Sequence, residues 1–478
     1  MHFINIIFFG GFFMRKRYFL ITFAIITIIA GVWVWACKHP FGPGISGISD
    51  VIDGGGSGGG GVPAKGWYMN ESGGPGYKGE ILYGTNVMVP SKVPPRGGLV
   101  YPKNSGNNYY RIPTLVVVTN GDLLAFADRR KGGVGDLPNQ IEIVVKRSTD
   151  NGTNWLEEQL VSPLSTSKEI SYGDAGVVLD RKTGNIIIAC ASGPGFLAPT
   201  KQQPLGSTDK NPIRINIIKG RDNGRIWEQP KDITAQIYGV NCKDPERKTW
   251  HAAFATAGNG VQLRNGRILF VLSVRKSEAN SPVYNHVIYS DDGGDTWKVS
   301  KGAPDISKNP SRGGGEAKIV ELNDGTLLMS IRPEGNEANF KRFFAKSTDN
   351  GNTWSVAEPK NDFPSSSSNG DIIYYTSVLN GWDKDRIVSM VDSLAYTAST
   401  PPGKPFLRIS YDEGNTWQGL QVFNGFAGYS SLAILPDGSI GILAELDNSW
   451  SGPIYFMRAN LKWLNPSDSG PTRQLDGN

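Results

Sequence analysis

Short runs of apolar or alternating residues recur along the chain, and five of them end in the same kind of polar motif. Each run has the length of a β-strand, and each motif has eight residues, is built on Asp and Gly, and closes with Trp. Asp accepts hydrogen bonds from backbone N–H groups in tight turns and Gly adopts positive φ, so each pair predicts a strand that leads into a β-hairpin. We expect the closing Trp to pack back onto the sheet. The pairs are IEIVVKRS with residues 148–155, IRINIIKG with 220–227, NHVIYS with 290–297, FKRFFAKS with 347–354, and PFLRIS with 410–417.

The spacing of these motifs indicates the architecture. Their starting positions are separated by 72, 70, 57 and 63 residues. Such long intervals, filled with strand-like runs, favour the blades of a β-propeller over a solenoid of short repeats. The roughly 370 residues after Tyr101 would hold six blades, and five motifs suffice if one blade is completed by strands from both ends of the ring. The pattern therefore predicts an all-β fold, a six-bladed β-propeller with five Asp-box hairpins.

Composition narrows the range of functions. The hydrophobic share of 39% is enough for a sizeable core. The net charge of +5 comes from 49 basic and 44 acidic residues, a mixture too even to indicate nucleic acid or a polybasic membrane surface. An acid-rich loop can also bind calcium, but no Glu follows the motifs at the spacing of an EF-hand. The three cysteines and four histidines give neither a disulfide framework nor metal-ligand spacing, so we expect no metal and no cofactor.

The start of the chain has the order of an export signal. A basic RKR segment at residues 15–17 precedes an apolar run over 18–36 that ends at Cys37. A cysteine in this place resembles a bacterial lipoprotein cleavage site, although Trp35 departs from the small residues usual there. The run approaches the length of a membrane span, so an uncleaved anchor and ordinary secretion remain alternatives. The favoured prediction is an exported lipoprotein at the bacterial outer membrane or cell surface, with a secreted or periplasmic protein as the alternative.

A glycine-rich segment, DGGGSGGGG at residues 53–61, predicts a flexible tether after the signal. We expect folding to begin between Gly66 and Tyr101. The predicted organisation is a signal peptide, lipoprotein signal or anchor over 1–37, a flexible linker over 38–65, a lead-in over 66–100, and the propeller over 101–478.

The Asp boxes, together with the sequence YRIP at residues 110–113, resemble the bacterial sialidases, the exo-α-sialidases of glycoside hydrolase family 33. The resemblance extends over about residues 101–464. Asp boxes alone are weakly specific, because propellers without enzymatic activity also carry them. The resemblance implies a site that removes terminal sialic acid, and its residues can be assigned one by one.

Three arginines hold the substrate carboxylate in this family, since guanidinium is permanently charged and binds a carboxylate bidentately. Arg111 of YRIP matches the first, and Arg332 in LLMSIRPEG matches the second. The third should lie on the strand that enters the last Asp box, which reads STPPGKPFLRIS. Either Arg408 or Lys404 could supply this cation, and the sequence leaves the choice open.

The resemblance also implies the reacting groups. Tyr429 matches the nucleophilic tyrosine, and sialidases with a Tyr nucleophile are a known exception to the scheme of paired carboxylates. A phenol needs a base, and Glu316 in SRGGGEAKIVE fits this role. Asp136, in a glycine-rich loop, matches the general acid and base.

Three further residues match supporting positions of the family: Arg130 near the sugar ring, Asp174 in the pocket, and Glu445 as the partner of the first arginine. The expected function is hydrolysis of sialylated glycoproteins, glycolipids or oligosaccharides by a retaining mechanism through a tyrosine-linked intermediate. A trans-sialidase or an intramolecular trans-sialidase is the enzymatic alternative. A surface glycan-binding module or adhesin without catalysis is the alternative from another class. We expect a monomer that binds no nucleic acid and reaches a membrane only through an N-terminal anchor or a lipidated Cys37.

Overall fold

The computed structural model describes residues 98–196, 213–277, 282–308, 313–334, 341–392, 404–423, 425–447 and 452–472, and two short paired strands, β1 (Ala64–Lys65) and β2 (Glu80–Ile81). These ranges belong to one compact unit, Gly61–Asn478. The predicted signal at 1–37, and nearly all of the linker at 38–65 and the lead-in at 66–100, lie outside the described residues. Across the ranges described, no helix is long and apolar enough to cross a membrane.

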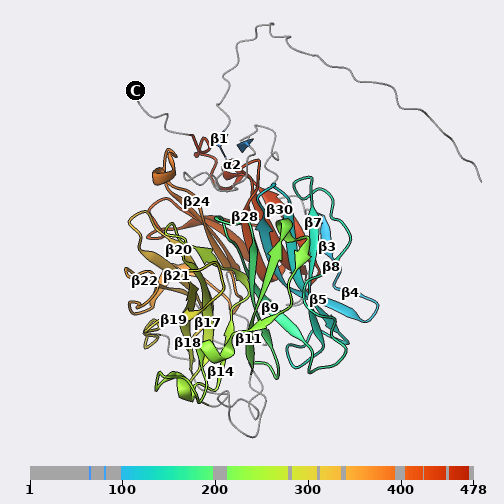
Figure 1. Cartoon of the computed structure of the whole chain (residues 1–478). Coiled ribbons are helices and arrows are strands. Elements are labelled where there is room, and N and C mark those ends of the chain that lie inside the picture. The colour runs from blue at the N-terminus through green and yellow to red at the C-terminus, as the bar shows by residue number, and fades with distance from the viewer. Residues whose placement is uncertain are drawn as a thin grey trace, which may run out of the picture. The chain divides into compact units, whose positions relative to one another are not determined.

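Six sheets, antiparallel except for the parallel pairing of β15 with β9, form the blades of a six-bladed β-propeller, which confirms the predicted fold (Figure 1). We number the blades in chain order. Blade 1 contains β4 (Asn104–Ser105), β5 (Asn108–Val117), β6 (Leu123–Lys131), β7 (Ile141–Ser148) and β8 (Gln159–Leu160). Blade 2 contains β9 (Tyr172–Leu179), β10 (Ile186–Ser192), β11 (Arg214–Arg221), β12 (Ile226–Trp227), β13 (Lys231–Asp232) and β15 (Gly258–Asn259). Blade 3 contains β14 (Ala252–Ala255), β16 (Val261–Gln262), β17 (Ile268–Arg275), β18 (Val283–Ser290) and β19 (Lys298–Val299).

The remaining blades are simpler, with a single path of four strands each. Blade 4 contains β20 (Gly314–Glu321), β21 (Leu327–Pro333), β22 (Lys341–Ser347) and β23 (Glu358–Pro364). Blade 5 contains β24 (Asp371–Thr376), β25 (Arg386–Asp392), β26 (Pro405–Ser410) and β27 (Gln418–Gln421). Blade 6 contains β28 (Phe426–Ile434), β29 (Ile440–Asp447), β30 (Ile454–Ala459) and β3 (Leu99–Tyr101). The helical elements described are short: α1 (Thr234–Ile237), α2 (Leu461–Leu464) and 3₁₀ turns at Asp222–Gly224, Arg247–Thr249 and Val378–Asn380.

Blade 6 closes the ring with strands from both ends of the propeller, as the sequence predicts. Leu99 and Tyr101 of β3 pair with Tyr455 and Ile454 of β30. Figure 1 shows this junction, where the cyan β3 lies near the red β30. The ring is thus completed by residues from opposite ends of the fold.

The hydrophobic core lies between neighbouring blades, because a blade sheet is apolar on the faces that meet the next sheet. One cluster joins β10 and β11 of blade 2 to β14 and β17 of blade 3, and another joins blade 5 to blade 6. All eight residues of β17 are buried. This continuous burial explains why six of the eight residues in ILFVLSVR are apolar, without regular alternation.

The five Asp boxes follow β7, β11, β18, β22 and β26 in blades 1 to 5. In the four boxes that begin with Ser, the Ser hydroxyl bonds to the Asp carboxylate and to the Gly N–H, and the Asp accepts from the N–H four residues on. In the box at 347–354, Asp349 accepts hydrogen bonds from the N–H groups of Asn352 and Thr353 at 3.1 and 2.8 Å. Ser347 bonds to Asp349 at 2.8 Å, and Gly351 has a φ of 84°. The indole N–H of Trp354 donates to the carbonyl of Gly351 at 3.2 Å. The predicted hairpin chemistry is confirmed in this motif.

The box at 220–227 differs, because Gly220 stands where the others have Ser. A Cβ at Gly220 would lie 2.4 Å from the ring of Trp227, so this position has no room for a side chain. The turn is a 3₁₀ element, and the carboxylate of Asp222 lies 3.7 Å from Arg225 in a partly exposed ion pair.

Candidate active site

Among the strands with irregular pairing, β5, β9, β20 and β28 of four blades each have two residues opposite a single residue of the neighbouring strand. The bulged positions are 112–113 in β5, 174–175 in β9, 315–316 in β20 and 428–429 in β28. A bulge bends a strand and re-aims a side chain at that point. Four predicted site residues, Arg111, Asp174, Glu316 and Tyr429, lie at or beside these bulges, and Asp174 has a φ of 57°. The bulges direct side chains of four separate blades toward one place.

Tyr429 contacts Glu316 and Arg332 through its hydroxyl group. The hydroxyl lies 2.7 and 2.5 Å from the two carboxylate oxygens of Glu316, to which it donates its proton. Nη1 of Arg332 donates to the phenolic oxygen at 2.8 Å and is also paired with Glu316. Burial raises the pKa of Tyr429 well above its usual range, the charge of Arg332 opposes this, and Glu316 adds to it. The phenol is therefore protonated, and a carboxylate is placed to accept that proton.

The absence of a side chain at Gly315, directly before Glu316, leaves room for the side chains of Glu334 and Arg332. A Cβ at Gly315 would lie 2.0 Å from Oε1 of Glu334 and 3.2 Å from Cδ of Arg332. Glu334 pairs with Nε of Arg332 at 3.2 Å. A larger residue at position 315 would displace the pair that holds Arg332 beside Tyr429.

Arg111 is held on the other side of Tyr429 by Glu445. Nε and Nη2 of Arg111 donate to the two carboxylate oxygens at 3.1 and 3.0 Å, and Glu445 is fully buried. The backbone N–H groups of Ile112 and Tyr429 donate to the same carboxylate at 2.8 and 3.0 Å. The guanidinium carbon of Arg111 lies 5.3 Å from the centre of the Tyr429 ring. Glu445 therefore fixes the first arginine and the tyrosine backbone together.

Asp136 and Arg130 form a second group of the site. Nη1 of Arg130 donates to Oδ1 of Asp136 and to the carbonyl of Val134, both at 2.6 Å. The side chain of Asp136 is 54% exposed, whereas that of Arg130 is fully buried. The loop aspartate is thus open to solvent, while a buried arginine holds it in place.

Asp128 joins Arg130 to Asp174, a link that the motifs did not reveal. Its carboxylate accepts from Nη2 of Arg130 at 2.9 Å and from the N–H of Asp174 at 3.1 Å. Burial raises the pKa of Asp128 to about 6, against the opposing charge of Arg130. Burial also raises the pKa of Asp174 well above its usual range, with smaller contributions from neighbouring carboxylates that include Glu316. Arg111 lies opposite Asp128 in the pairing of β5 with β6, and this register connects the two groups in one site.

Arg408 and Lys404 lie differently from the other predicted cations. The guanidinium of Arg408 lies over the rings of Phe363 and Phe406, 4.4 and 5.2 Å from their centres. It donates to the carbonyl of Pro364 at 3.4 Å. Lys404 is exposed just before β26. These contacts are with blade 4 and with Arg408's own strand, whereas Arg111 and Arg332 both contact Tyr429.

A further buried polar group joins strands of blades 2, 5 and 6. Asp371 accepts from the amide of Asn259 and from the N–H of Leu432, both at 2.7 Å. Lys318, two residues beyond Glu316, is 2% exposed, and burial lowers its pKa to about 8. In the sequence, this group appears only as charged residues within otherwise apolar strands. The same pattern is common on sheet faces that are exposed to solvent, so it does not predict a buried group. Among the residues described, no three His, Cys, Asp or Glu side chains gather as a metal site would require.

The model of the BNR repeat-like domain matches residues 112–361, just over half of the 478-residue chain. The chain belongs to this family. It is similar to a sialidase of Micromonospora viridifaciens, with 31% identity over 394 residues, 79% of this chain and 56% of the relative. It is also similar to a sialidase of Bacteroides fragilis, with 27% identity over 357 residues, 70% of this chain and 60% of the relative. The resemblance to the bacterial sialidases is confirmed, and the chain spans less than two thirds of the length of these two relatives.

Solved structures of similar fold agree with this assignment. The Hadza microbial sialidase Hz136 has a TM-score of 0.60 at 26% identity, covering 74% of this chain and 66% of its own. A leech intramolecular trans-sialidase has a TM-score of 0.59 at 19% identity, covering 78% of this chain and 71% of its own. At the lower identity, the likeness shows only that the fold is the same.

Proposed function

We propose that this protein is a retaining exo-α-sialidase that hydrolyses terminal sialic acids of glycoproteins, glycolipids or oligosaccharides. The observation that carries the proposal is the contact of Tyr429 with both oxygens of Glu316 and with Arg332. A buried tyrosine in a structural core would not need a carboxylate and a guanidinium on its hydroxyl. The names of the similar proteins support the same activity.

In the proposed first step, the Tyr429 oxygen attacks the anomeric carbon while Glu316 takes the phenolic proton. The bond from the anomeric carbon to the leaving oxygen breaks, and Asp136 gives that oxygen a proton. A neutral phenol suits a substrate that carries its own carboxylate on the reacting carbon, because a carboxylate nucleophile would meet like-charge repulsion. Arg111 and Arg332, which flank Tyr429, would bind the substrate carboxylate.

In the proposed second step, Asp136 takes a proton from water, and the water oxygen attacks the same carbon. The bond to Tyr429 breaks, and the phenolate recovers its proton from Glu316. Two inversions give net retention of configuration. The exposure of Asp136 is consistent with its role, because a leaving group and a water molecule must both reach it.

The test is the reaction of the purified chain with sialyllactose, followed by NMR. We expect α-sialic acid as the first product, because the mechanism retains configuration. A first product in the β form would overturn the tyrosine mechanism. Sialic acid transferred to an added acceptor, or an anhydro product, would replace hydrolysis by one of the transferase alternatives. The absence of any turnover, with a folded protein, would favour the non-catalytic glycan-binding module.

We also propose that the protein is an exported monomer, held at the cell surface through a lipidated Cys37. The support is the apolar run at 18–36 that ends in this cysteine. Expression with an isotopically labelled fatty acid should label the wild-type chain but not Cys37→Ala. Equal labelling of the two chains would exclude this attachment, and an unlabelled chain retained in the membrane would indicate an uncleaved anchor.

A further inference from the structure

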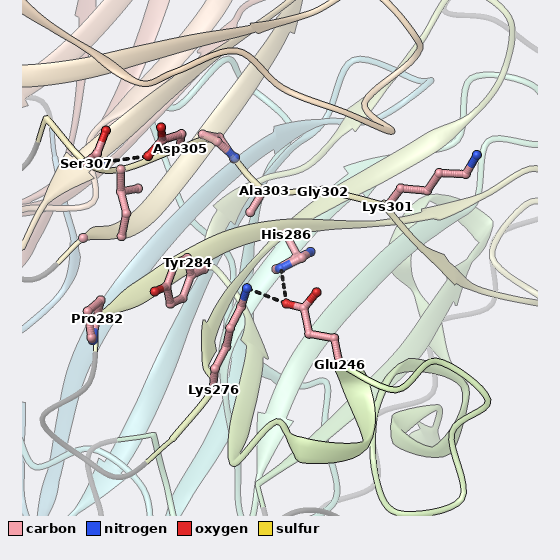
Figure 2. A pocket seen from close by; sticks show the side chains of 13 residues that line it. Glu246, Lys276, Pro282, Tyr284, His286, Lys301, Gly302, Ala303, Asp305 and Ser307 are labelled. Carbon is pink, nitrogen blue, oxygen red and sulfur yellow. Dashed lines mark hydrogen bonds and ion pairs between the residues drawn. The ribbon is translucent and has the colours of Figure 1, made fainter.

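A cavity of about 520 Å³ lies at the edge of blade 3, apart from the contacts of Tyr429. Its walls come from β18, from the segment 301–307 after β19, and from Glu246 and Lys276 (Figure 2). A volume of this size falls within the range of small-molecule sites in proteins, which is about 300–1,000 Å³.

Hydrogen bonds connect the region of the cavity to the strands that carry Glu316 and Arg332. Gly313, which lines it, bridges to Val283 and accepts a hydrogen bond from the N–H of Glu334 at 3.3 Å. Asn285, on β18 between two lining residues, donates to the carbonyl of Gly315 at 2.5 Å. Gly315 directly precedes Glu316, so one backbone and one side-chain hydrogen bond connect the region of the cavity to the neighbourhood of the proposed base.

The charged groups of the cavity are balanced. Lys276 is paired with Glu246, and the ammonium of Lys276 lies 4.2 Å from the centre of the Tyr284 ring. Lys301 and Asp305 are exposed lining residues of opposite charge. Figure 2 shows Lys276 and His286 directed toward Glu246, with Tyr284 beside them. An ion of either sign would meet as much repulsion as attraction here, whereas hydroxyl groups can both donate and accept.

His286 supplies a polar group that the described residues leave unsatisfied. Its side chain is 3% exposed, and neither ring nitrogen makes a hydrogen bond of normal geometry with the described residues, although the backbone of Ser300 lies near enough to raise its pKa against the effect of burial. Nε2 lies 4.0 Å from Oε1 of Glu246, which is beyond hydrogen-bond distance. Burial lowers the pKa of His286 to about 4, so the ring is neutral near pH 7, with one donor and one acceptor. Buried polar groups are nearly always paired, and this ring still has a donor or an acceptor to offer to a bound molecule.

We propose that this cavity binds a neutral saccharide unit, a hexose or an N-acetylhexosamine, of the glycan that carries the sialic acid. Sugar hydroxyls match the mixed donors and acceptors of Glu246, Lys276 and His286. The apolar C–H face of a sugar matches Tyr284 and Pro304, which also line the cavity. The identity of the glycan rests on the proposed function, whereas the affinity for a neutral sugar does not.

The test is a titration with lactose, in the presence of a saturating unsaturated sialic acid analogue that blocks the active site. Binding is followed by NMR shifts or by calorimetry. We expect wild type to bind lactose, and Tyr284→Ala to weaken the affinity by about tenfold or more. Tyr289→Ala is the matched control, because Tyr289 lies on the same strand but stacks with Arg267 at 4.1 Å. That variant should bind within about twofold of wild type.

Other outcomes separate this inference from the proposed function. Lys276→Gln should also weaken the affinity for lactose, so the result does not depend on the folding of one variant. No lactose binding by wild type, or equal binding by Tyr284→Ala, would overturn the site, even if sialosides are hydrolysed. Tighter binding of glucuronic acid than of lactose would overturn the neutral class. Lactose binding without sialoside hydrolysis would refute only the proposed enzyme, leaving a glycan-binding protein.

Discussion

At Tyr429, opposite charges act on one phenolic oxygen. Glu316 lies within 2.7 Å and favours the protonated phenol, while Arg332 at 2.8 Å favours the phenolate. Burial has the largest effect and raises the pKa of the tyrosine, with a smaller contribution in the same direction from Glu316. The resting residue therefore keeps its proton until Glu316 removes it. We infer that the arginines stabilise the charge that develops on this oxygen, rather than ionising the tyrosine in advance.

Tyr429→Phe tests the role of that one oxygen. The change removes the nucleophile but leaves the ring, so we expect hydrolysis of a fluorogenic sialoside to fall by about 100-fold or more. Tyr375→Phe is the control, since its buried hydroxyl donates to the carbonyl of Gly438 at 2.7 Å. The control should retain activity even if it is less stable. Hydrolysis by Tyr429→Phe within about threefold of wild type would exclude the nucleophile assignment.

The third cation can be tested with Arg408→Ala and Lys404→Ala. Because Arg408 stacks on Phe363, we expect its loss to lower stability while inhibition by an unsaturated sialic acid analogue changes little. Lys404→Ala should change neither, since Lys404 is exposed. Arg332→Ala is the positive control and should weaken the inhibitor by about 2–5 kcal/mol. Arg408→Ala or Lys404→Ala with a loss of that size would identify the missing member of the clamp.

At the scale of elements, the bulged strands position the site residues, whereas the Asp boxes stabilise the hairpins of the blades. The bulges at 315–316 and 428–429 turn the side chains of Glu316 and Tyr429 away from the regular strand pairing. The strands lose regular backbone pairing at these positions. The Asp boxes close the hairpins at the other ends of the blades' outer strands with side-chain bonds such as those of Asp349, which follows β22. We infer that the boxes support the fold that the bulged strands require.

Asp349→Ala should lower stability through the loss of these bonds. Burial alone would raise the pKa of Asp349, but the hydrogen bonds from Thr353 outweigh it and hold the pKa below its usual value. We expect the free energy of unfolding in urea to fall by about 1–3 kcal/mol. Asp222→Ala, in the box without the Ser, should cost no more than about 0.5 kcal/mol. Equal losses in the two variants would show that the side-chain bonds do not stabilise the turn.

At the scale of the whole molecule, the sequence predicted the repeated hairpins but not the buried polar residues at the centre of the propeller. Each box is local, so strands such as β7 and β22 follow from residues adjacent in sequence. Arg111 and Glu445 form an ion pair although they are 334 residues apart in the sequence. Only the family resemblance could predict this contact. Asp128, Lys318 and Asp371 match no motif, because burial at the centre depends on how six blades close.

The buried Asp371 predicts a pH dependence of stability. Burial raises its pKa to about 6, while Lys318 opposes the shift; in the unfolded chain we expect about 3.9. Between these values the folded state binds more protons, so this stabilisation is complete below about pH 3.9 and is lost as pH rises through about 6. From pH 5 to 7, the free energy of unfolding should therefore fall less in Asp371→Asn than in wild type. The exposed Asp291→Asn should keep the wild-type slope, and an unchanged slope in Asp371→Asn would contradict the assignment.

Closure of the ring depends on a strand of three residues, and this can be measured. Tyr101 of β3 is fully buried, stacks on Tyr110 with ring centres 5.0 Å apart, and donates to the carbonyl of Ala125 at 2.8 Å. These contacts join blade 6 to blade 1, so Tyr101→Ala should lower the free energy of unfolding by about 3–5 kcal/mol. Leu99→Ala, on the same strand but 50% exposed, should cost no more than about 0.5 kcal/mol. Because the site takes residues from both of these blades, we expect Tyr101→Ala to lose activity on heating at the temperature where it unfolds. A loss below about 1 kcal/mol would mean that the ring is held closed without this strand.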